Sequence, residues 1–350
     1  MKKQEEKLSK QMKKAVRTRT KTETPDVYEG NTSTMISTGS TLLDLAISGG
    51  RVRGGGIPGG ILVEVFGPSS SGKTVLLSEI AGNIQRMGGD VMFNDPEARL
   101  DAKFAQLFGV KFHELEYTTP DTVTEVFSGV RKWTPEDLTK VNGVFADSLA
   151  ALSTDLEMLT EDGDKMGMRR PKEFSEQLRR TCRILQKNNY LMVCSNQVRV
   201  NTDAGAYGQK YTTPGGLGVG FYSSLRLRTK IIEKIKSQKK FSGVSVDRFI
   251  GVRTEIEVHK SSVWKPYRTA PLTILFDYGI DDIRENLQFV KDYTKATTYM
   301  VKNENLGVRK ETAINKVESM GLEQELREQV IDLWTEIEAM FNSDRKPKIR

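Results

Sequence analysis

The sequence predicts an α/β protein whose core is a mostly parallel central sheet, followed by a smaller helical region. Two observations carry this prediction. Short apolar runs recur between residues 33 and 284 and alternate with longer amphipathic segments, which is typical of parallel strands joined by crossover helices. One of these runs leads into a loop rich in glycine and serine that ends in Lys73 and Thr74. A loop of this kind, between a strand and a helix, is typical of phosphate-binding α/β folds.

The composition is that of a globular protein, since 37% of the 350 residues are hydrophobic and 28% are charged. No run approaches the roughly 20 uncharged apolar residues that a membrane helix needs. The first residues lack the apolar core of a secretory signal, so we expect a cytoplasmic protein. The two cysteines, Cys182 and Cys194, are too few and too far apart for a metal site, and we expect two reduced thiols.

The formal net charge of +7 is concentrated in four basic segments, namely the first twenty residues and residues 169–172, 226–240 and 345–350. A polyanionic partner would explain this excess, because lysines and arginines displace counterions from phosphates. A merely basic protein without such a partner is the alternative, and charge alone does not decide between them.

Residues 1–32 are expected to form a basic helix followed by a linker rich in threonine, proline and glycine. Leu8, Met12 and Val16 recur at four-residue spacing and give the helix a thin apolar stripe. The alternatives are a solvated helix and a helix that docks on a neighbouring subunit.

The core, residues 33–284, contains five predicted buried strands and two clear amphipathic helices. The strands are expected at 61–66, 90–94, 143–146, 191–195 and 224–229, and the helices at 75–87 and 172–187. Later apolar runs, at 254–259 and 272–276, alternate without long helices between them, so they predict an antiparallel extension of the sheet. Residues 285–350 are expected to form a small C-terminal domain with a basic tail, and 322–341 is its strongest helix.

The phosphate loop is the most specific motif. It comprises Gly67, Pro68, Ser69, Ser70, Ser71, Gly72, Lys73 and Thr74, and Val75 opens the helix that follows. Its glycines let backbone N–H groups and the helix N-terminus face the phosphates. Lys73 is placed to reach the β- and γ-phosphates, and Thr74 offers a hydroxyl to Mg²⁺. A surface turn with a solvated lysine is the ordinary alternative.

Two carboxylates follow other predicted strands. Asp147 ends the run 143–146 and is a candidate Mg²⁺ ligand through water, with a helix N-cap as the alternative. Glu97 follows the strand 90–94 and is a candidate general base, because ligands gather at the carboxyl ends of parallel strands. On spacing alone, a surface turn acid is an equal alternative for Glu97.

Six successive blocks resemble the bacterial RecA family. They are 36–45, the phosphate loop, 94–101 (NDPEARLD), 146–152 (ADSLAAL), 195–199 (SNQVR) and 213–216 (TPGG). The resemblance implies a RecA-like P-loop ATPase core with a mostly parallel sheet, an N-terminal oligomerisation helix and a small helical C-terminal domain. It covers about residues 33–284.

The resemblance also implies roles around ATP and Mg²⁺. Glu97 matches the family's water-activating glutamate, and Gln197 matches the residue that senses the γ-phosphate; with Lys73, these are the expected catalytic residues. Asp101 and Phe104 match positions that line the adenine pocket. Lys260 matches a basic residue that caps ATP from the neighbouring subunit.

The chain departs from the family pattern at several positions. Ser262 stands where a second capping lysine is expected, although Lys265 is close by, and Gly220 replaces a lysine near Arg226. The segment 50–56 (GRVRGGG) lengthens the approach to the turn before the first strand.

Two segments, about 157–172 and 199–216, resemble the family's DNA-binding loops. Loops of this length without periodicity are usually functional or disordered. The residues expected to contact DNA are Met166, Gly167, Arg169, Lys172, Ser175, Arg179, Arg199, Tyr207, Gly215 and Gly216. Met166 resembles the apolar side chain that props bases apart, and Tyr207 has stacking on a base or packing in the loop as alternatives.

The resemblance therefore implies a recombinase that forms helical filaments on single-stranded DNA and exchanges strands with a homologous duplex while hydrolysing ATP. Loading or mediator proteins are further expected partners. The alternatives are a RecA-fold accessory ATPase or helicase, and a nucleotide-gated DNA-binding scaffold with little hydrolysis.

Overall fold

The computed structural model describes residues 34–159, 169–200, 211–214, 216–343 and 345. The predicted basic helix and linker at the N-terminus lie outside the described residues. So do four predicted DNA contacts, namely Met166, Gly167, Tyr207 and Gly215, and most of the basic tail.

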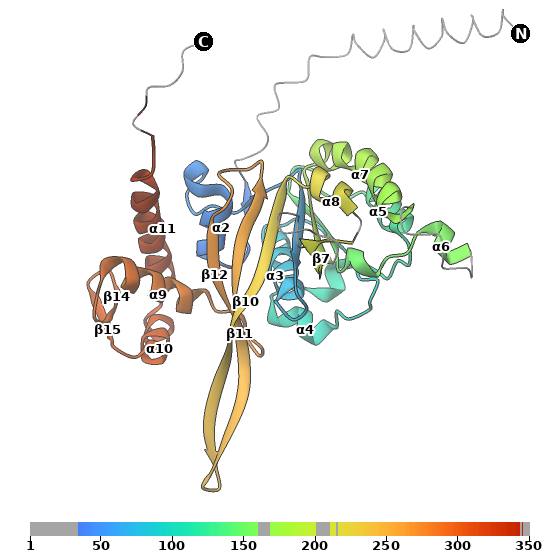
Figure 1. Ribbon diagram of the computed structural model, residues 1–350. Coiled ribbons are helices and arrows are strands. Elements are labelled where there is room, and N and C mark those ends of the chain that lie inside the picture. The colour runs from blue at the N-terminus through green and yellow to red at the C-terminus, as the bar shows by residue number, and fades with distance from the viewer. Residues whose placement is uncertain (1–33, 160–168, 201–210, 215, 344, 346–350) are drawn as a thin grey trace, which may run out of the picture.

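A single nine-stranded sheet organises the described part of the chain (Figure 1), in the order β13-β12-β11-β10-β3-β7-β6-β4-β5. Strands β3 to β7 and the start of β10 are parallel to their neighbours. Strands β10 to β13 run antiparallel to one another. The bounds are β3 Leu62–Gly67, β4 Val91–Asn94, β5 Leu115–Thr118, β6 Asn142–Ala146, β7 Tyr190–Gln197, β10 Leu225–Phe241, β11 Val244–Ser261, β12 Thr269–Leu275 and β13 Gly279–Ile280.

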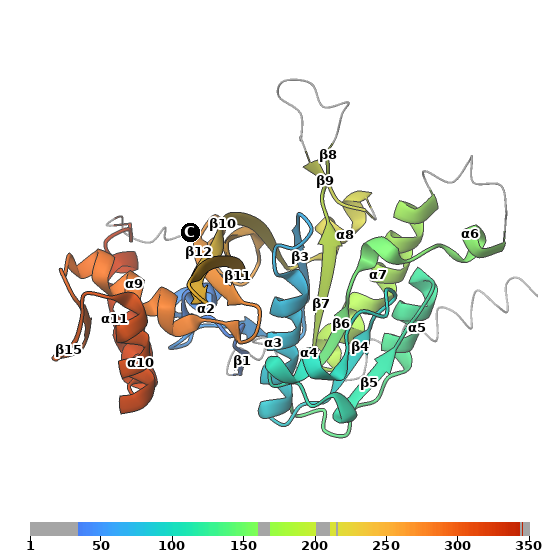
Figure 2. The same cartoon turned by 90° about the horizontal axis from the view of Figure 1, so that it is seen from below.

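Helices cover both faces of the parallel half of this sheet, as Figure 2 shows from below. Helices α3 (Lys73–Arg86) and α4 (Ala102–Leu107) lie on one face, and α5 (Val123–Lys132), α7 (Arg169–Lys187) and α8 (Gly216–Tyr222) on the other. The strands alternate between these layers with a period of two. In β3, Val63 and Val65 join the α3 cluster, whereas Leu62 joins the cluster of α5 and α7.

The C-terminal region packs directly on the core. It consists of α9 (Asp282–Thr294), the hairpin of β14 (Tyr299–Val301) and β15 (Glu304–Gly307), α10 (Lys310–Met320) and α11 (Glu323–Ala339). Leu287, Val317 and Leu326 are buried in the same apolar cluster as the α3 face of the sheet. Helix α2 (Thr41–Ser48) joins the two parts, because Thr41 donates from its backbone N–H to Asp282 at 2.8 Å.

The remaining described elements are short. They are β1 (Met35–Ile36), β2 (Ile57–Pro58), α6 (Asp155–Leu159), β8 (Arg199–Val200) and β9 (Tyr211–Thr212), together with 3₁₀ turns at Gly49–Arg51, Phe112–Glu114 and Leu149–Ala151. No helix in the described ranges is long and apolar enough to cross a membrane. Both cysteines are free thiols, as expected.

The predicted strands and helices are confirmed with shifts of a few residues, and the expected antiparallel extension is present. Two boundaries were wrong. The strand predicted at 224–229 continues to Phe241, because beyond Thr229 neither face is buried and the apolar alternation that marks a half-buried strand is lost. The first predicted DNA loop ends earlier than residue 172, since α7 already begins at Arg169.

The glycine-rich approach to β3 is held against α2. Gly54, Gly55 and Gly56 all have positive φ, and the N–H of Gly56 donates to the backbone carbonyl of Asp44 at 3.1 Å. A Cβ on Gly55 would lie 2.3 Å from that same carbonyl oxygen. Gly50, in the same segment, has no neighbouring atom within 4 Å of its Cβ position.

Gly55→Ala is therefore expected to lower the free energy of unfolding by about 2–3 kcal/mol, through a strained φ and a clash with backbone. Gly50→Ala is the matched control and is expected to change it by less than about 0.5 kcal/mol. Urea denaturation followed by circular dichroism measures both. Equal midpoints for the two variants would contradict this account of the segment.

Candidate functional site at the carboxyl edge of the sheet

The loop between β3 and α3 has no room for a side chain at either of its glycines. A Cβ on Gly67 would lie 1.9 Å from the Thr229 hydroxyl, and one on Gly72 would lie 2.1 Å from Cδ1 of Ile274. Gly72 also has φ +85°. Ser71 fastens the loop, since its hydroxyl donates to the carbonyl of Pro68 at 2.8 Å and lies 2.7 Å from the Thr229 hydroxyl. The loop is thus a rigid cradle fixed against β10 and β12.

Lys73 reaches over this cradle. Its Nζ donates to the carbonyls of Gly67 at 3.1 Å and Pro68 at 2.7 Å. Burial lowers the pKa of Lys73, and the negative charges of Asp147 and Glu97 partly oppose that effect. A cation held by carbonyl oxygens at a helix N-terminus fits an incoming phosphate group.

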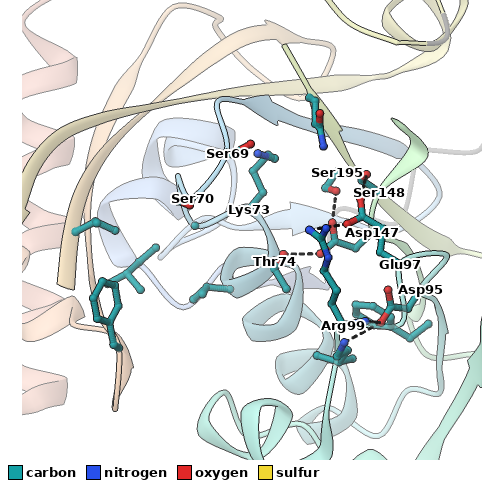
Figure 3. A pocket seen from close by; sticks show the side chains of 18 residues that line it. Ser69, Ser70, Lys73, Thr74, Asp95, Glu97, Arg99, Asp147, Ser148 and Ser195 are labelled. Carbon is teal, nitrogen blue, oxygen red and sulfur yellow. Dashed lines mark hydrogen bonds and ion pairs between the residues drawn. The ribbon is translucent and has the colours of Figure 1, made fainter. Parts of the chain in front are cut away.

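Thr74 and Asp147 meet beside the cradle (Figure 3). The Thr74 hydroxyl donates to Oδ2 of Asp147 at 2.6 Å, and the Ser195 hydroxyl donates to the other carboxylate oxygen. Burial raises the pKa of Asp147, while the two hydroxyl donors work against that rise. A hydroxyl and a carboxylate are hard oxygen ligands that suit Mg²⁺.

Within the described ranges, no group of three or more His, Cys, Asp or Glu side chains could hold a metal ion. A cation beside Thr74 and Asp147 would therefore depend on oxygens that the protein does not supply. This is the usual situation of Mg²⁺ bound through one carboxylate and substrate phosphates.

Glu97 faces the same space from the turn after β4. It accepts a hydrogen bond from the Ser148 hydroxyl at 3.0 Å and pairs with the exposed Arg99 at 2.5 Å. Asp95 shapes the turn, because its carboxylate accepts from the backbone N–H groups of Arg99 at 2.7 Å and Leu100 at 2.8 Å. The resulting arrangement presents an oriented carboxylate opposite the phosphate cradle.

These groups line one cavity of about 350 Å³. One wall is polar and includes Lys73, Thr74, Glu97 and Asp147; the other is apolar and is formed by Val252, Ile274 and Phe276. The pairing of a cationic cradle with an apolar wall fits a ligand with a charged end and a flat, apolar end, as a nucleotide has.

The structure does not bring Asp101 and Phe104 into this lining. Asp101 caps α4 by accepting from the N–H of Phe104 at 2.9 Å, and the Phe104 ring packs edge-on against Phe108 at 4.7 Å. Their adenine role stays a prediction. Phe276, which is 51% exposed, lines the cavity instead and was missed. An exposed aromatic directly after an apolar strand was the available signal.

Gln197 ends β7 and lines the cavity, and its role as a phosphate sensor stays a prediction. Its neighbour Asn196 accepts from the Gln197 N–H at 3.0 Å and donates to the carbonyl of Pro214 at 2.9 Å. Asn196 also donates to the buried carboxylate of Glu64 at 2.9 Å. The rim is thus tied by hydrogen bonds to the segment that closes the second predicted DNA loop.

The predicted DNA contacts that are described lie on neighbouring elements at one end of the molecule (Figure 2). Arg169, Lys172, Ser175 and Arg179 lie on α7, Gly216 begins α8, and Arg199 lies in β8. The two helices touch closely, because a Cβ on Gly216 would lie 2.8 Å from Cβ of Pro171. Lys172 and Arg179 are exposed.

Lys260 lies outside the cavity of its own chain. Its Nζ donates to the carbonyls of Gly220 and Phe221, both at 2.9 Å, and its pKa is lowered by burial and by the nearby Arg226. A Cβ on Gly220 would lie 3.1 Å from the Arg226 guanidinium, which accounts for a small residue there. Lys265 is directed elsewhere, with its Nζ 3.8 Å from Glu338.

Comparison with known proteins agrees with this geometry. The family model for the RecA N-terminal domain matches residues 7–281. Protein RecA of Phytoplasma mali is 34% identical over 283 residues, which cover 79% of each chain. Protein RecA of Borrelia duttonii is 35% identical over 286 residues, covering 80% of this chain and 74% of the relative. Protein RecA of Legionella pneumophila is 31% identical over 318 residues, covering 88% and 87%.

The Thr74 hydroxyl provides a test of the cation site. We expect Thr74→Val to weaken binding of a fluorescent ATP analogue about tenfold or more in Mg²⁺, which corresponds to about 1.4 kcal/mol. In EDTA the two proteins are expected to bind alike. Ser78→Ala, one turn along α3, is the control, because the buried Ser78 hydroxyl has no hydrogen-bond partner in the described structure. Equal losses with and without Mg²⁺ would show that Thr74 acts on the loop rather than on the cation.

Proposed function

Because this chain belongs to the RecA family, we propose that it is an ATP-hydrolysing recombinase that assembles on single-stranded DNA and pairs it with a homologous duplex. The observation that carries the proposal is the position of Glu97 across one cavity from Lys73 and the Thr74–Asp147 pair. Its partners would be single-stranded DNA, homologous duplex DNA, other copies of the chain and loading proteins.

The residues that line the cavity would have different roles in ATP hydrolysis. The phosphate cradle and Lys73 would bind the triphosphate, and Mg²⁺ held at Thr74 and Asp147 would neutralise charge that develops on the phosphate oxygens. Glu97 would orient a water molecule for in-line attack and accept its proton. The Ser148 hydroxyl, 3.0 Å from Glu97, would fix the direction of that carboxylate.

Gln197 supports a link between the nucleotide and DNA binding. A neutral amide can hydrogen-bond to a terminal phosphate and release it without a change of charge. A movement of Gln197 would also displace Pro214, since the Asn196 side chain is hydrogen-bonded to the Gln197 N–H and to the Pro214 carbonyl. Loss of the terminal phosphate would then alter the order of the second DNA loop, a switch of the order–disorder kind.

Lys260 supports assembly into a filament. It donates only to backbone carbonyls of its own chain in the described structure and lies away from its own phosphate cradle. It would therefore complete the cavity of the next copy. Because Ser262 replaces a second lysine, the cap would be carried mainly by Lys260.

The accessory-ATPase and scaffold alternatives are less well supported. A scaffold with little hydrolysis needs no oriented carboxylate opposite the phosphate cradle, whereas Glu97 is both oriented by Ser148 and exposed to the cavity.

We expect Glu97→Gln to lower DNA-stimulated ATP hydrolysis about 100-fold or more, as is usual when a general base is lost, while ATP binding is retained. Glu116→Gln, on the exposed side of β5, is the control and should match the wild type. The measurement is phosphate release with and without single-stranded DNA. Hydrolysis indifferent to DNA, or undiminished in Glu97→Gln, would favour the accessory-ATPase alternative.

Mixed filaments test whether Lys260 acts on the neighbouring copy. Lys260→Ala and Glu97→Gln proteins are each expected to be nearly inactive. An equimolar mixture should recover about a quarter of the wild-type rate, because random mixing along a head-to-tail interface places intact Glu97 against intact Lys260 at that frequency. No recovery, with filaments visible by electron microscopy, would mean that Lys260 acts within its own chain.

A further inference from the structure

The distal halves of β10 and β11 form a two-stranded arm, defined here as residues 232–250. The arm leaves the body of the molecule and projects well beyond it (Figure 1). Strand β3 pairs with β10 only over residues 225–228, and β12 pairs with β11 only over residues 251–257. Residues 232–241 therefore pair only with β11 and residues 244–250 only with β10, so the outer edges of both strands are free over these ranges.

The arm is basic. It carries five cationic side chains, Lys234, Lys236, Lys239, Lys240 and Arg248, against two acidic ones, Glu233 and Asp247. Lys236 is paired with Asp247 at 2.6 Å. Along the described chain, no ion pair is found for Lys239, Lys240 or Arg248. Three cations thus extend into solvent from the outer part of the arm.

The tip of the arm is apolar. Phe241 and Val244 face each other across the turn at residues 242–243, and they are 77% and 65% exposed. Phe249, on the other side of the ribbon, is 58% exposed. These side chains contribute to neither apolar cluster of the sheet. Exposed apolar groups gathered within a charged surface mark an interaction site.

Protection of free edges is the ordinary explanation for lysines in such a ribbon, because charge prevents edge-to-edge pairing. It does not account for the length of the arm or for the exposed aromatic side chain at its tip. An isolated hairpin gains little stability by itself, so extending it by ten residues in β10 and seven in β11 brings no benefit to the fold.

We propose that the arm binds duplex DNA in a groove. A two-stranded ribbon fits the major groove of B-DNA. The seven residues that β11 contributes to the arm, at about 3.3 Å each, give it a reach of about 23 Å, which is more than half of a helical turn. Lys239, Lys240 and Arg248 would contact phosphates, and Phe241 would act as an apolar wedge against the bases at the tip.

The proposal deepens the function proposed above and rests on it for the choice of DNA as the polymer. It assigns the duplex partner to a surface that lies outside the nucleotide cavity and outside the two predicted DNA loops. A second copy of this chain is the competing occupant, and the experiment separates the two.

The experiment measures binding of a fluorescent 25-base-pair duplex to the full chain by anisotropy, without nucleotide, over a series of salt concentrations. In the triple variant Lys239→Gln, Lys240→Gln and Arg248→Gln, we expect affinity to fall about tenfold and the log–log salt slope to fall by about 2–3, since each phosphate contact contributes about 0.9. Phe241→Ser should weaken binding without changing the slope.

The control variant, Lys132→Gln, Lys140→Gln and Lys187→Gln, removes the same charge from exposed positions at the far ends of α5 and α7 and the loop before β6. It should bind like the wild type. Unchanged affinity and slope in the arm variant, equal losses in arm and control variants, or no duplex binding by the wild type would each overturn the proposal. So would loss of self-association in sedimentation with duplex binding intact, which would identify a second copy as the partner.

The arm variant should retain hydrolysis stimulated by single-stranded DNA. Failure of that stimulation in the wild type would count against the proposed function, whereas the duplex measurement, made without nucleotide, would still decide the role of the arm.

Discussion

The buried carboxylate of Glu64, in the middle of β3, is the constraint on which the arrangement of the site depends. It is fully buried, and it accepts from Nε of Arg226 on β10 at 2.6 Å and from Asn196 on β7 at 2.9 Å. An uncompensated charge at this depth would cost several kcal/mol, so both neighbours of β3 are held in one register by their need to satisfy it. Because β3 carries the phosphate loop, the same constraint fixes that loop relative to both neighbouring strands.

This network also connects segments that are distant in the sequence. The Asn196 side chain makes three hydrogen bonds, to the Glu64 carboxylate, the Pro214 carbonyl and the Gln197 N–H. A movement of Asn196 would break these bonds. On the other side, the Arg226 guanidinium stacks 4.5 Å from the centre of the Phe66 ring. Burial, and to a smaller degree Arg226, lowers the pKa of Lys260. The rim of the cavity, Pro214 and the surface that bears Lys260 are therefore connected by hydrogen bonds that meet at one buried charge.

The sequence predicted the fold well where burial imposes a pattern. The parallel strands read as short apolar runs because helices cover both of their faces, and the phosphate loop was recognisable because Gly67 and Gly72 have no room for side chains. Glu97, Thr74 and Asp147 could be placed because strand ends meet at one edge. Phe276 could not, because it reaches the cavity through the position of β12 in the antiparallel half of the sheet. The Glu64 network could not, because it depends on β3 lying between β7 and β10. The length of β10 was missed because a strand exposed on both faces carries no periodic signal.

The parts of this site tolerate substitution unequally. Core positions need only an apolar side chain of suitable volume, so most of them can vary while the sheet persists. Gly67 and Glu64 have no such freedom, since a clash with the Thr229 backbone at Gly67, or an unpaired buried charge at Glu64, has no local remedy. Gly72 is limited by its φ of +85°. Surface groups such as Ser262 and the side chains of the arm are limited neither by a backbone clash nor by the need to pair a buried charge. Substitutions are therefore expected to be tolerated more readily at the surface than at the strand ends that line the cavity.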